Sequence, residues 1–255
     1  MSLYINNSGY KQIKELYVKV AGSWQPCKDA FIKVADEWKS LLYKPGTRTF
    51  TTNGSFTIPT GVYSLAIQVF GAGGGGGGGT ENEQGGGGGG GGSGGVATGD
   101  IAVTPGDVIT FTMSTGGIGG RGLNSPGATG SNTTLIHNST NYIGYGGVGG
   151  GGGQSYSEGA GGAAGSYTSP GATGVMGITG DAARGGGGDY ASHIGGDGGD
   201  ARFGKGTGGA GGVYVNGSNA SGYSAGAGGA GSRDRSAPHY WVGGKGAAGL
   251  VVITW

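Results

Sequence analysis

Gly71-Ala72-Gly73-Gly74-Gly75-Gly76-Gly77-Gly78-Gly79 follows the strand-like run 64–70 and begins a series of glycine-rich tracts, most of them 7 to 11 residues long. In polyproline II geometry a residue rises about 3.1 Å, so ten residues span roughly 30 Å. Such a helix has no internal hydrogen bonds, and its N–H and C=O groups must therefore pair with neighbouring chains. Only glycine lets neighbours come close enough on several sides. The tracts predict a bundle of antiparallel polyglycine II helices.

Glycine and proline content alone is also compatible with a structured head and a disordered glycine tail. The 255 residues include 72 Gly and 7 Pro, a level typical of low-complexity chains. However, only 11% of the residues are charged and 13 are Tyr, whereas disordered chains are rich in charge and poor in aromatic residues. The chain also ends in the apolar run 250–255, which is typical of a buried strand. That strand needs a partner, so the tracts must fold back to deliver it.

Strand-like segments flank the glycine region on both sides. They lie at 49–52, 55–59, 64–70, 100–103, 107–114, 132–137 and the C-terminus, with turns at 59–61 and 105–107. We expect one small β-sandwich that holds both ends of the glycine region. The predicted fold class is all-β with irregular parts, divided into a hairpin module at 1–46 and a β-sandwich with polyglycine II bundle at 47–255.

The N-terminal module contains a threefold repeat of 13 or 14 residues. Its copies are 4–10, 17–24 and 31–38, and each runs from an aromatic residue through a Gly or Asp turn to Tyr or Trp. Each copy is therefore predicted to be a β-hairpin. Three hairpins packed together can bury aromatic faces that one cannot. The alternatives are an attachment module, with Tyr17, Trp24, Phe31 and Trp38 as its contacts, and a mere stabilising cap.

Charge and cysteine content exclude several functional classes. The net charge of +1 gives no case for nucleic-acid binding, and the single Cys27 excludes an internal disulfide. No apolar stretch approaches a membrane span, and the N-terminus does not read as a signal peptide. We expect a protein made in a cytoplasm.

Apparent catalytic and ligand motifs arise here from glycine content. Residues 91–95 match G-x-S-x-G and several tracts match G-x-G-x-x-G, but neither has the required strand–helix context. Residues 195–200 match the start of a calcium-binding repeat, yet Arg202 stands at its apolar position. We predict no enzyme activity, no cofactor and no metal site.

The interruptions between tracts carry most of the chemistry. They combine Tyr, Ser and Asn with occasional Trp and Arg, which is the composition of binding loops. Counting tract directions from the sandwich places loops 80–84, 123–130, 154–158 and 232–242 at the far end of the bundle, and leaves loops between 166 and 221 undecided. Solvated turns that shield the bundle end are the simpler interpretation. The predicted receptor-binding residues are Glu81, Asn124, Tyr156, Tyr190, His193, Arg233, Arg235, His239, Tyr240 and Trp241.

The runs 56–59, 66–76 and 246–253, with the glycine repeats between them, resemble the glycine-rich domain of phage tail proteins. The alternation of glycine motifs with variable loops resembles the tip adhesins of T-even-type phages. That resemblance implies a polyglycine II sandwich that caps a trimeric tail-fibre tip protein, one monomer per fibre. It also implies loops that bind a bacterial outer-membrane protein or surface glycan, at the distal tip of the virion fibre. The N-terminal repeats do not match the fibre-docking segment of that group.

Two alternatives belong to other classes. One is a structural glycine-rich protein of a wall, a coat or an ice-binding surface, for which uniform faces of small residues are expected. The other is a structural phage tail-tip subunit that never contacts a receptor. The irregular, aromatic loops favour recognition over both.

Overall fold

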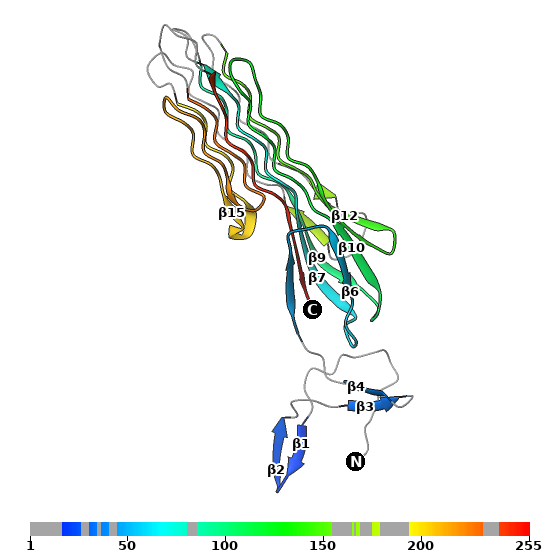
Figure 1. Cartoon of the computed structure of the whole chain (residues 1–255). Coiled ribbons are helices and arrows are strands. Elements are labelled where there is room, and N and C mark those ends of the chain that lie inside the picture. Colours follow the sequence, from blue (N-terminus) through cyan, green and yellow to red (C-terminus); the bar gives the residue numbers. More distant parts are fainter. Residues whose placement is uncertain are drawn as a thin grey trace.

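A computed structural model of the protein describes residues 17–26, 31–34, 37–40, 45–80, 86–154, 165, 167–168, 175–178, 194–231 and 240–255. This part of the chain is all-β, and its helical content is one 3-10 turn, η1 (Arg202–Gly204). Figure 1 shows a β-sandwich that continues into a long bundle of extended tracts, with two hairpins on the opposite side of the sandwich.

Two short hairpins make up the described part of the N-terminal region. They are β1 (Tyr17–Val20) with β2 (Ser23–Pro26), and β3 (Phe31–Val34) with β4 (Glu37–Ser40). Their registers are equivalent, because Lys19 pairs with Trp24 and Lys33 pairs with Trp38. Ala21 and Gly22 both have positive φ, at 49° and 87°, as a two-residue type I′ turn requires. The hairpin repeat is thus seen twice, and the copy at 4–10 lies outside the described residues.

The first hairpin does not bury its aromatic face. Trp24 is 67% exposed and Tyr17 is 45% exposed, so the mutual packing of hairpins predicted from the repeat is not seen here. Tyr17, Lys19 and Trp24 share one face of the hairpin, with Lys19 Nζ 5.9 Å from the centre of the Trp24 ring. The hairpin therefore presents an aromatic and cationic face to solvent.

The β-sandwich consists of two five-stranded antiparallel sheets, in the orders β13-β12-β11-β10-β6 and β14-β9-β7-β18-β5. Alternate residues of the central strand β7, including Leu65, Ile67 and Val69, are fully buried, as expected for a strand with one core face. Phe50, Phe56, Phe111 and Trp255 pack at the edge of this core. The strands are β5 (Thr47–Phe50), β6 (Gly54–Thr57), β7 (Ser64–Phe70), β9 (Val96–Ala102), β10 (Val108–Thr112), β11 (Thr133–His137), β12 (Thr140–Gly144), β13 (Tyr167–Thr168), β14 (Val175–Ile178) and β18 (Leu250–Thr254).

Ten extended tracts form the described part of the bundle. Four very short strands lie at the ends of these tracts: β8 (Gly79–Thr80), β15 (Gly206–Thr207), β16 (Ser221–Gly222) and β17 (Tyr240–Trp241). We number the tracts in chain order: tract 1 (71–79), tract 2 (86–95), tract 3 (114–122), tract 4 (125–131), tract 5 (145–153), tract 6 (194–199), tract 7 (208–212), tract 8 (215–220), tract 9 (223–231) and tract 10 (242–249).

The hydrogen bonds of tract 1 repeat every third residue. Successive N–H groups donate to tracts 2, 4 and 10 in turn: Gly74 to Gly92 at 2.9 Å, Gly75 to Ala128 at 2.9 Å, Gly76 to Gly244 at 3.1 Å, and Gly77 again to tract 2, at Gly89 and 2.8 Å. Its carbonyl groups accept, with the same period, from tracts 3, 5 and 9. A strand would alternate with a period of two, whereas three residues per turn is the geometry of polyproline II. The tract is a polyglycine II helix.

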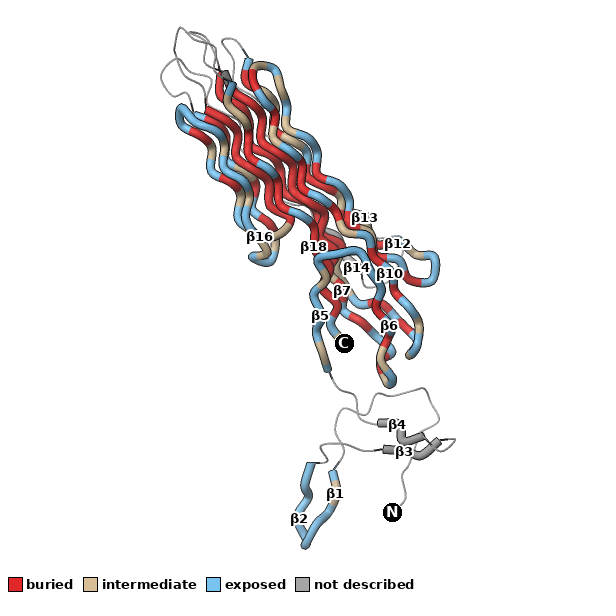
Figure 2. Tube along the Cα trace, in the orientation of Figure 1, coloured by how far each residue is buried: buried red, intermediate tan, exposed pale blue. Residues whose placement is uncertain are grey.

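Two tracts are each surrounded by six others. Tract 1 bonds to tracts 2, 3, 4, 5, 9 and 10, and tract 9 bonds to tracts 1, 2, 6, 7, 8 and 10. Residues 71–79 and 224–231 are all buried, and Figure 2 shows this buried interior running the length of the bundle. Successive tracts from 1 to 5 and from 6 to 10 alternate in direction, as predicted, but spatial neighbours include parallel pairs such as tracts 1 and 9.

Close approach of the backbones is what excludes side chains from the interior. A Cβ atom added at Gly73, Gly76 or Gly226 would lie against a carbonyl group of a neighbouring tract, well inside van der Waals contact. The obstacle in each case is backbone rather than a side-chain end that could move aside. Glycine is therefore required along both central tracts at such positions.

Six tracts are direct continuations of sandwich strands. Strands β7, β10 and β12 run outward into tracts 1, 3 and 5, while tracts 2, 4 and 10 return into β9, β11 and β18. Tracts 6 to 9 do not enter the sheets. Near the sandwich, tract 6 is connected to tract 7 through η1 and β15, and tract 8 is connected to tract 9 through β16, which pairs with β15. The Phe203 ring meets Phe70 edge-on, with centroids 6.1 Å apart, and Tyr223 packs beside the same cluster. These contacts attach the second half of the bundle to the sandwich.

Polar side chains replace missing backbone acceptors on the outer tracts. Carboxylate oxygens of Asp197 and Asp200 accept the N–H groups of Gly211 (2.8 Å) and Gly208 (2.7 Å). The amide oxygens of Asn216 and Asn219 likewise accept the N–H groups of Val242 (2.8 Å) and Lys245 (2.7 Å). The aspartates of the calcium-like motif therefore serve as acceptors between tracts.

Two sequence interpretations require correction. Segment 123–130 was expected to be a far-end loop, yet 125–131 is tract 4, and only the turn around Asn124 lies at the far end. Residues 215–220, which fall among the loops of undecided position between 166 and 221, form tract 8. Both segments carry enough Ser, Thr, Asn or Ala to hide their helical period, because outer tracts need glycine only on the side that faces the bundle.

A mutation at the centre of the bundle tests the requirement for glycine. Gly76→Ala forces a Cβ against the Gly228 carbonyl, and we expect it to destabilise the protein by more than about 3 kcal/mol, the upper end of ordinary overpacking. Val148→Ala is the control, because Val148 is 43% exposed on tract 5. Thermal unfolding followed by circular dichroism measures both. Equal melting temperatures for Gly76→Ala and the wild type would contradict the requirement.

A side-chain contact joins Asp107, which precedes β10, to His137 on β11. His137 is buried, and its Nε2 lies 3.2 Å from Oδ2 of Asp107. The hydrogen bond from His137 is the main reason that the pKa of Asp107 lies below its ordinary value of 3.8. A lowered folded-state pKa stabilises the fold above the unfolded value and loses that contribution as pH falls through the folded value.

Acid unfolding should therefore depend on Asp107. We expect Asp107→Asn to melt at a lower temperature than the wild type at neutral pH, and the two to converge as pH falls below about 4. Asp100→Asn, an exposed aspartate on β9, is the control and should keep the wild-type difference between neutral and acid pH. Parallel melting curves of Asp107→Asn and wild type across this range would refute the assignment.

Candidate binding surface at the far end of the bundle

The far end of the bundle, opposite the sandwich, collects turns from widely separated parts of the chain. Outward tracts 1, 3, 5, 7 and 9 end there, and inward tracts 2, 4, 6, 8 and 10 begin there. We call this region the far-end surface. Its described residues are Gly79–Thr80, Gly122, Leu123, Asn124, Gln154, Ile194, Val213, Tyr214, Val215, Tyr240 and Trp241.

Tyr240 and Trp241 lie on β17, which pairs antiparallel with β8. This pairing positions the predicted centre of recognition against the end of the central tract. Gly122, with φ of 83°, donates its N–H to the Trp241 carbonyl at 3.2 Å. A Cβ at Gly122 would lie 2.7 Å from Cδ1 of Tyr240, so the Tyr240 ring packs over this glycine. Tyr240 remains 55% exposed and is available for contact.

The turn that carries Asn124 is held by backbone hydrogen bonds. Asn124 has φ of 54°, a left-handed conformation that Asn tolerates better than most residues. Its N–H donates to the Gly153 carbonyl at 2.9 Å, and Ser125 Oγ accepts the Arg121 N–H at 3.0 Å. The side chain of Asn124 is exposed on this anchored turn. The turn lies beside β17, because the N–H of Gly122 is hydrogen-bonded to Trp241 on that strand.

An apolar turn at the same end was missing from the predicted site. Ile194, Val213, Tyr214 and Val215 are each between 42% and 50% exposed, and Ile194 bridges to Val213. Tyr214 has φ of 56°, an unusual conformation for an aromatic residue. The signal in the sequence was the run Val213-Tyr214-Val215 inside a glycine-rich region, which needs no apolar residues for its own core.

The other predicted receptor-binding residues lie outside the described residues. These are Glu81, Tyr156, Tyr190, His193, Arg233, Arg235 and His239. Of the predicted attachment residues, Tyr17 and Trp24 lie exposed on the first hairpin, and Phe31 and Trp38 lie on β3 and β4. The structure therefore brings Tyr240, Trp241 and Asn124 together at the far end, with the attachment residues on hairpins across the sandwich (Figure 1).

The direction of the middle tracts divides the segment 194–223 between the two ends. The turn 213–215 lies at the far end, whereas Asp200, Phe203 and the turn 220–223 lie beside the sandwich. For the described residues between 194 and 221, the structure therefore settles which turns lie at the far end of the bundle and which lie beside the sandwich.

The described residues show neither a metal-binding cluster nor a membrane-spanning helix. They hold no group of three His, Cys, Asp or Glu side chains placed to bind a metal ion. Among the same residues, no helix has the length and apolar character needed to span a membrane.

Comparison with protein families supplies the classification. The glycine-rich domain family matches residues 49–255, which begins inside β5 and ends at the last residue of the chain. The chain belongs to the glycine-rich domain family. The matched region contains both sheets and every tract of the bundle, while the hairpin repeats precede it. Comparison with curated proteins gives no match.

Proposed function

We propose that this glycine-rich domain protein is a receptor-recognising adhesin at the tip of a bacteriophage tail fibre. It binds a bacterial outer-membrane protein or surface glycan through the far-end surface and so determines host range. The observation that carries this proposal is the concentration of exposed aromatic and apolar side chains on turns at one end of a rigid bundle. Tyr240, Tyr214 and Val213 serve no core there, and exposed groups of this kind mark interaction surfaces.

The bundle suits this role because its turns are independent of its packing. Most cross-tract hydrogen bonds lie between backbone groups, and they do not depend on which residues fill the turns. A receptor-binding surface must change its side chains without losing its fold, and rigid anchored loops bind with little entropy loss. The turn at Asn124 and the β8–β17 pair illustrate this arrangement.

The hairpins at the other side of the sandwich support the second half of the proposal. Their equivalent registers repeat the same Lys–Trp pairing, and the face that contains Trp24 is open to solvent. We propose that these faces dock on a trimeric fibre-tip protein, with one copy of this chain per fibre, at the distal tip of the virion. The protein is then made in the host cytoplasm and joined to the fibre during assembly.

Binding to cells tests the receptor half. Labelled wild-type protein should bind intact host bacteria and lose binding to a mutant that lacks one surface receptor. Tyr240→Ala should weaken binding at least tenfold, since a central aromatic contact contributes upward of about 1.4 kcal/mol. Tyr63→Ala is a matched control, because Tyr63 is 49% exposed on the sandwich side of the molecule. A folded wild type that binds no cell would favour the structural tail-tip alternative.

Fibre attachment is tested separately with the first hairpin. Trp24→Ala should reduce association with purified fibres at least fivefold, because it removes the most exposed aromatic side chain of the docking face. Val20→Ala is the control, since Val20 is 54% exposed on the opposite face of the same hairpin. Cosedimentation with fibres gives the measurement. Equal association of Trp24→Ala and wild type would remove the hairpin face from the attachment site.

A further inference from the structure

Tracts 3, 8 and 10 form a flat side face that is distinct from the far-end surface. Tracts 3 and 10 are joined by the hydrogen bond from Gly246 N–H to the Gly117 carbonyl (2.9 Å), and tracts 8 and 10 by the bond from Ala220 N–H to the Lys245 carbonyl (3.0 Å). In tracts 3 and 10 every third residue points outward, so successive outward residues lie about 9 Å apart along each tract. The outward residues are Thr115, Ile118, Arg121, Val242, Lys245, Ala248, Asn216 and Asn219.

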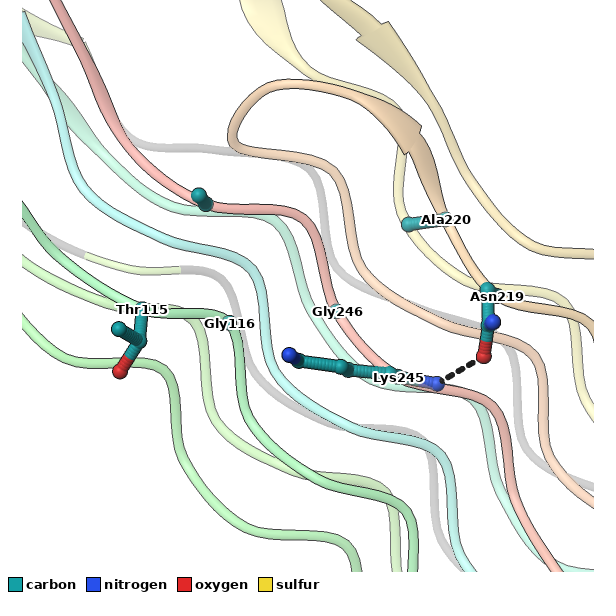
Figure 3. Close-up of a pocket in the computed structure, with 7 residues that line it drawn as sticks. Thr115, Gly116, Asn219, Ala220, Lys245 and Gly246 are labelled. Carbon is teal, nitrogen blue, oxygen red and sulfur yellow. Dashed lines mark hydrogen bonds between the residues drawn. The ribbon is translucent and has the colours of Figure 1, made fainter. Parts of the chain in front are cut away.

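A groove lies in this face. It has a volume of about 250 Å³ and is lined by Thr115, Gly116, Asn219, Ala220, Lys245, Gly246 and Ala248. Glycine and alanine dominate the lining, so the floor is shallow and open. Figure 3 shows the Lys245 side chain extending from tract 10 toward the tract that carries Gly116, with Asn219 on the other side. The side-chain Oδ1 of Asn219 accepts the backbone N–H of Lys245 at 2.7 Å, which holds this wall of the groove in place.

The charge of the side face is positive. Arg121 and Lys245 are exposed, and among the described residues no carboxylate forms an ion pair with either of them. The outward residues of the face include no Asp or Glu. The nearest tract with aspartates is tract 6, on the far side of tract 9, and its Asp197 and Asp200 carboxylates already accept backbone N–H groups.

The chemistry of the face selects among anionic ligands. It offers two cations in adjacent rows, together with the amide and hydroxyl groups of Asn216, Asn219 and Thr115. It presents no aromatic side chain, and single-stranded nucleic acids need aromatic platforms for their bases. A hydroxyl-rich chain with repeated negative charges fits this combination of donors and shallow relief.

We propose that the side face binds an acidic polysaccharide. The groove takes one sugar residue, whose carboxylate or phosphate group pairs with Lys245, and the next charged sugar along the strand lies at Arg121. This site is independent of the far-end surface, so it does not need the proposed receptor function to hold.

Binding of purified full-length protein to polygalacturonate, with neutral dextran as the comparison, tests the proposal. We expect affinity electrophoresis to show retardation by polygalacturonate only, and raised salt to weaken it. Lys245→Gln should reduce affinity about fivefold. Lys205→Gln, which makes the same charge change beside η1, should leave it unchanged. No retardation, or equal losses for the two variants, would overturn the proposal.

A second pair of variants tests the groove without changing charge. Ala248→Phe fills the groove from its exposed floor position and should abolish binding. Ala210→Phe adds the same bulk at an exposed position of tract 7 and should bind as the wild type does. Circular dichroism of all variants checks that the fold is retained. Undiminished binding by a folded Ala248→Phe protein would place the ligand elsewhere.

Discussion

The structure depends on close backbone contact between neighbouring extended helices. A polyproline II helix leaves all its N–H and C=O groups unpaired within itself, and buried backbone groups that lack partners are costly. The bundle meets this demand by pointing successive residues of tract 1 at different neighbours, so that Gly74, Gly75 and Gly76 each find another tract. Such contacts require that nothing larger than hydrogen stands between the chains. The high glycine content is thus a packing requirement, and the hydrogen bonds between tracts offset the extra entropy that ordered glycine loses.

The sandwich supplies what the bundle lacks, namely an apolar core and a defined register. Strand β7 lies between β9 and β18, and tract 1 continues between tracts 2 and 10, so the pairing partners are carried over from sheet to bundle. At Phe70 and Gly71 the hydrogen-bond period changes from two to three. Phe70 is fully buried there, and its ring packs edge-on against the ring of Phe203. Phe70 therefore contacts the sheet, the tracts around tract 1 and the turn that leads to the tracts around tract 9.

Much of this architecture could be predicted from the sequence. The all-β class, the sandwich at the ends of the glycine region and the polyglycine II bundle follow from tract length and from apolar runs such as 64–70 and 250–255. Strand β12 was missed because Tyr142 is its one buried apolar residue, next to a glycine tract. Tracts 4 and 8 were missed because outer helices tolerate side chains on two of every three residues. Asn216 and Asn219 could have revealed tract 8, since they recur at a spacing of three.

Part of the candidate site could be predicted from the directions of the tracts. Counting tract directions places the turn at Asn124 and the β17 strand at the far end, because each tract reverses the chain. It could not place Val213–Val215, since that prediction requires tract 8 to be recognised first. Nor could the side face be foreseen, because Arg121 and Lys245 lie 124 positions apart in the chain and become neighbours only through the hydrogen bonds of tracts 3 and 10.

The central position of tract 1 also has a consequence for biosynthesis. This tract leaves the ribosome before most of its partners, because the acceptors for the N–H groups of Gly73 and Gly76 are the carbonyls of Ala247 and Gly244, which lie 174 and 168 residues further along the chain. Contacts of such sequence separation slow folding. The set of six tracts around tract 1 therefore cannot be completed before tract 10 has been synthesised, and the nascent glycine tracts must stay soluble until then.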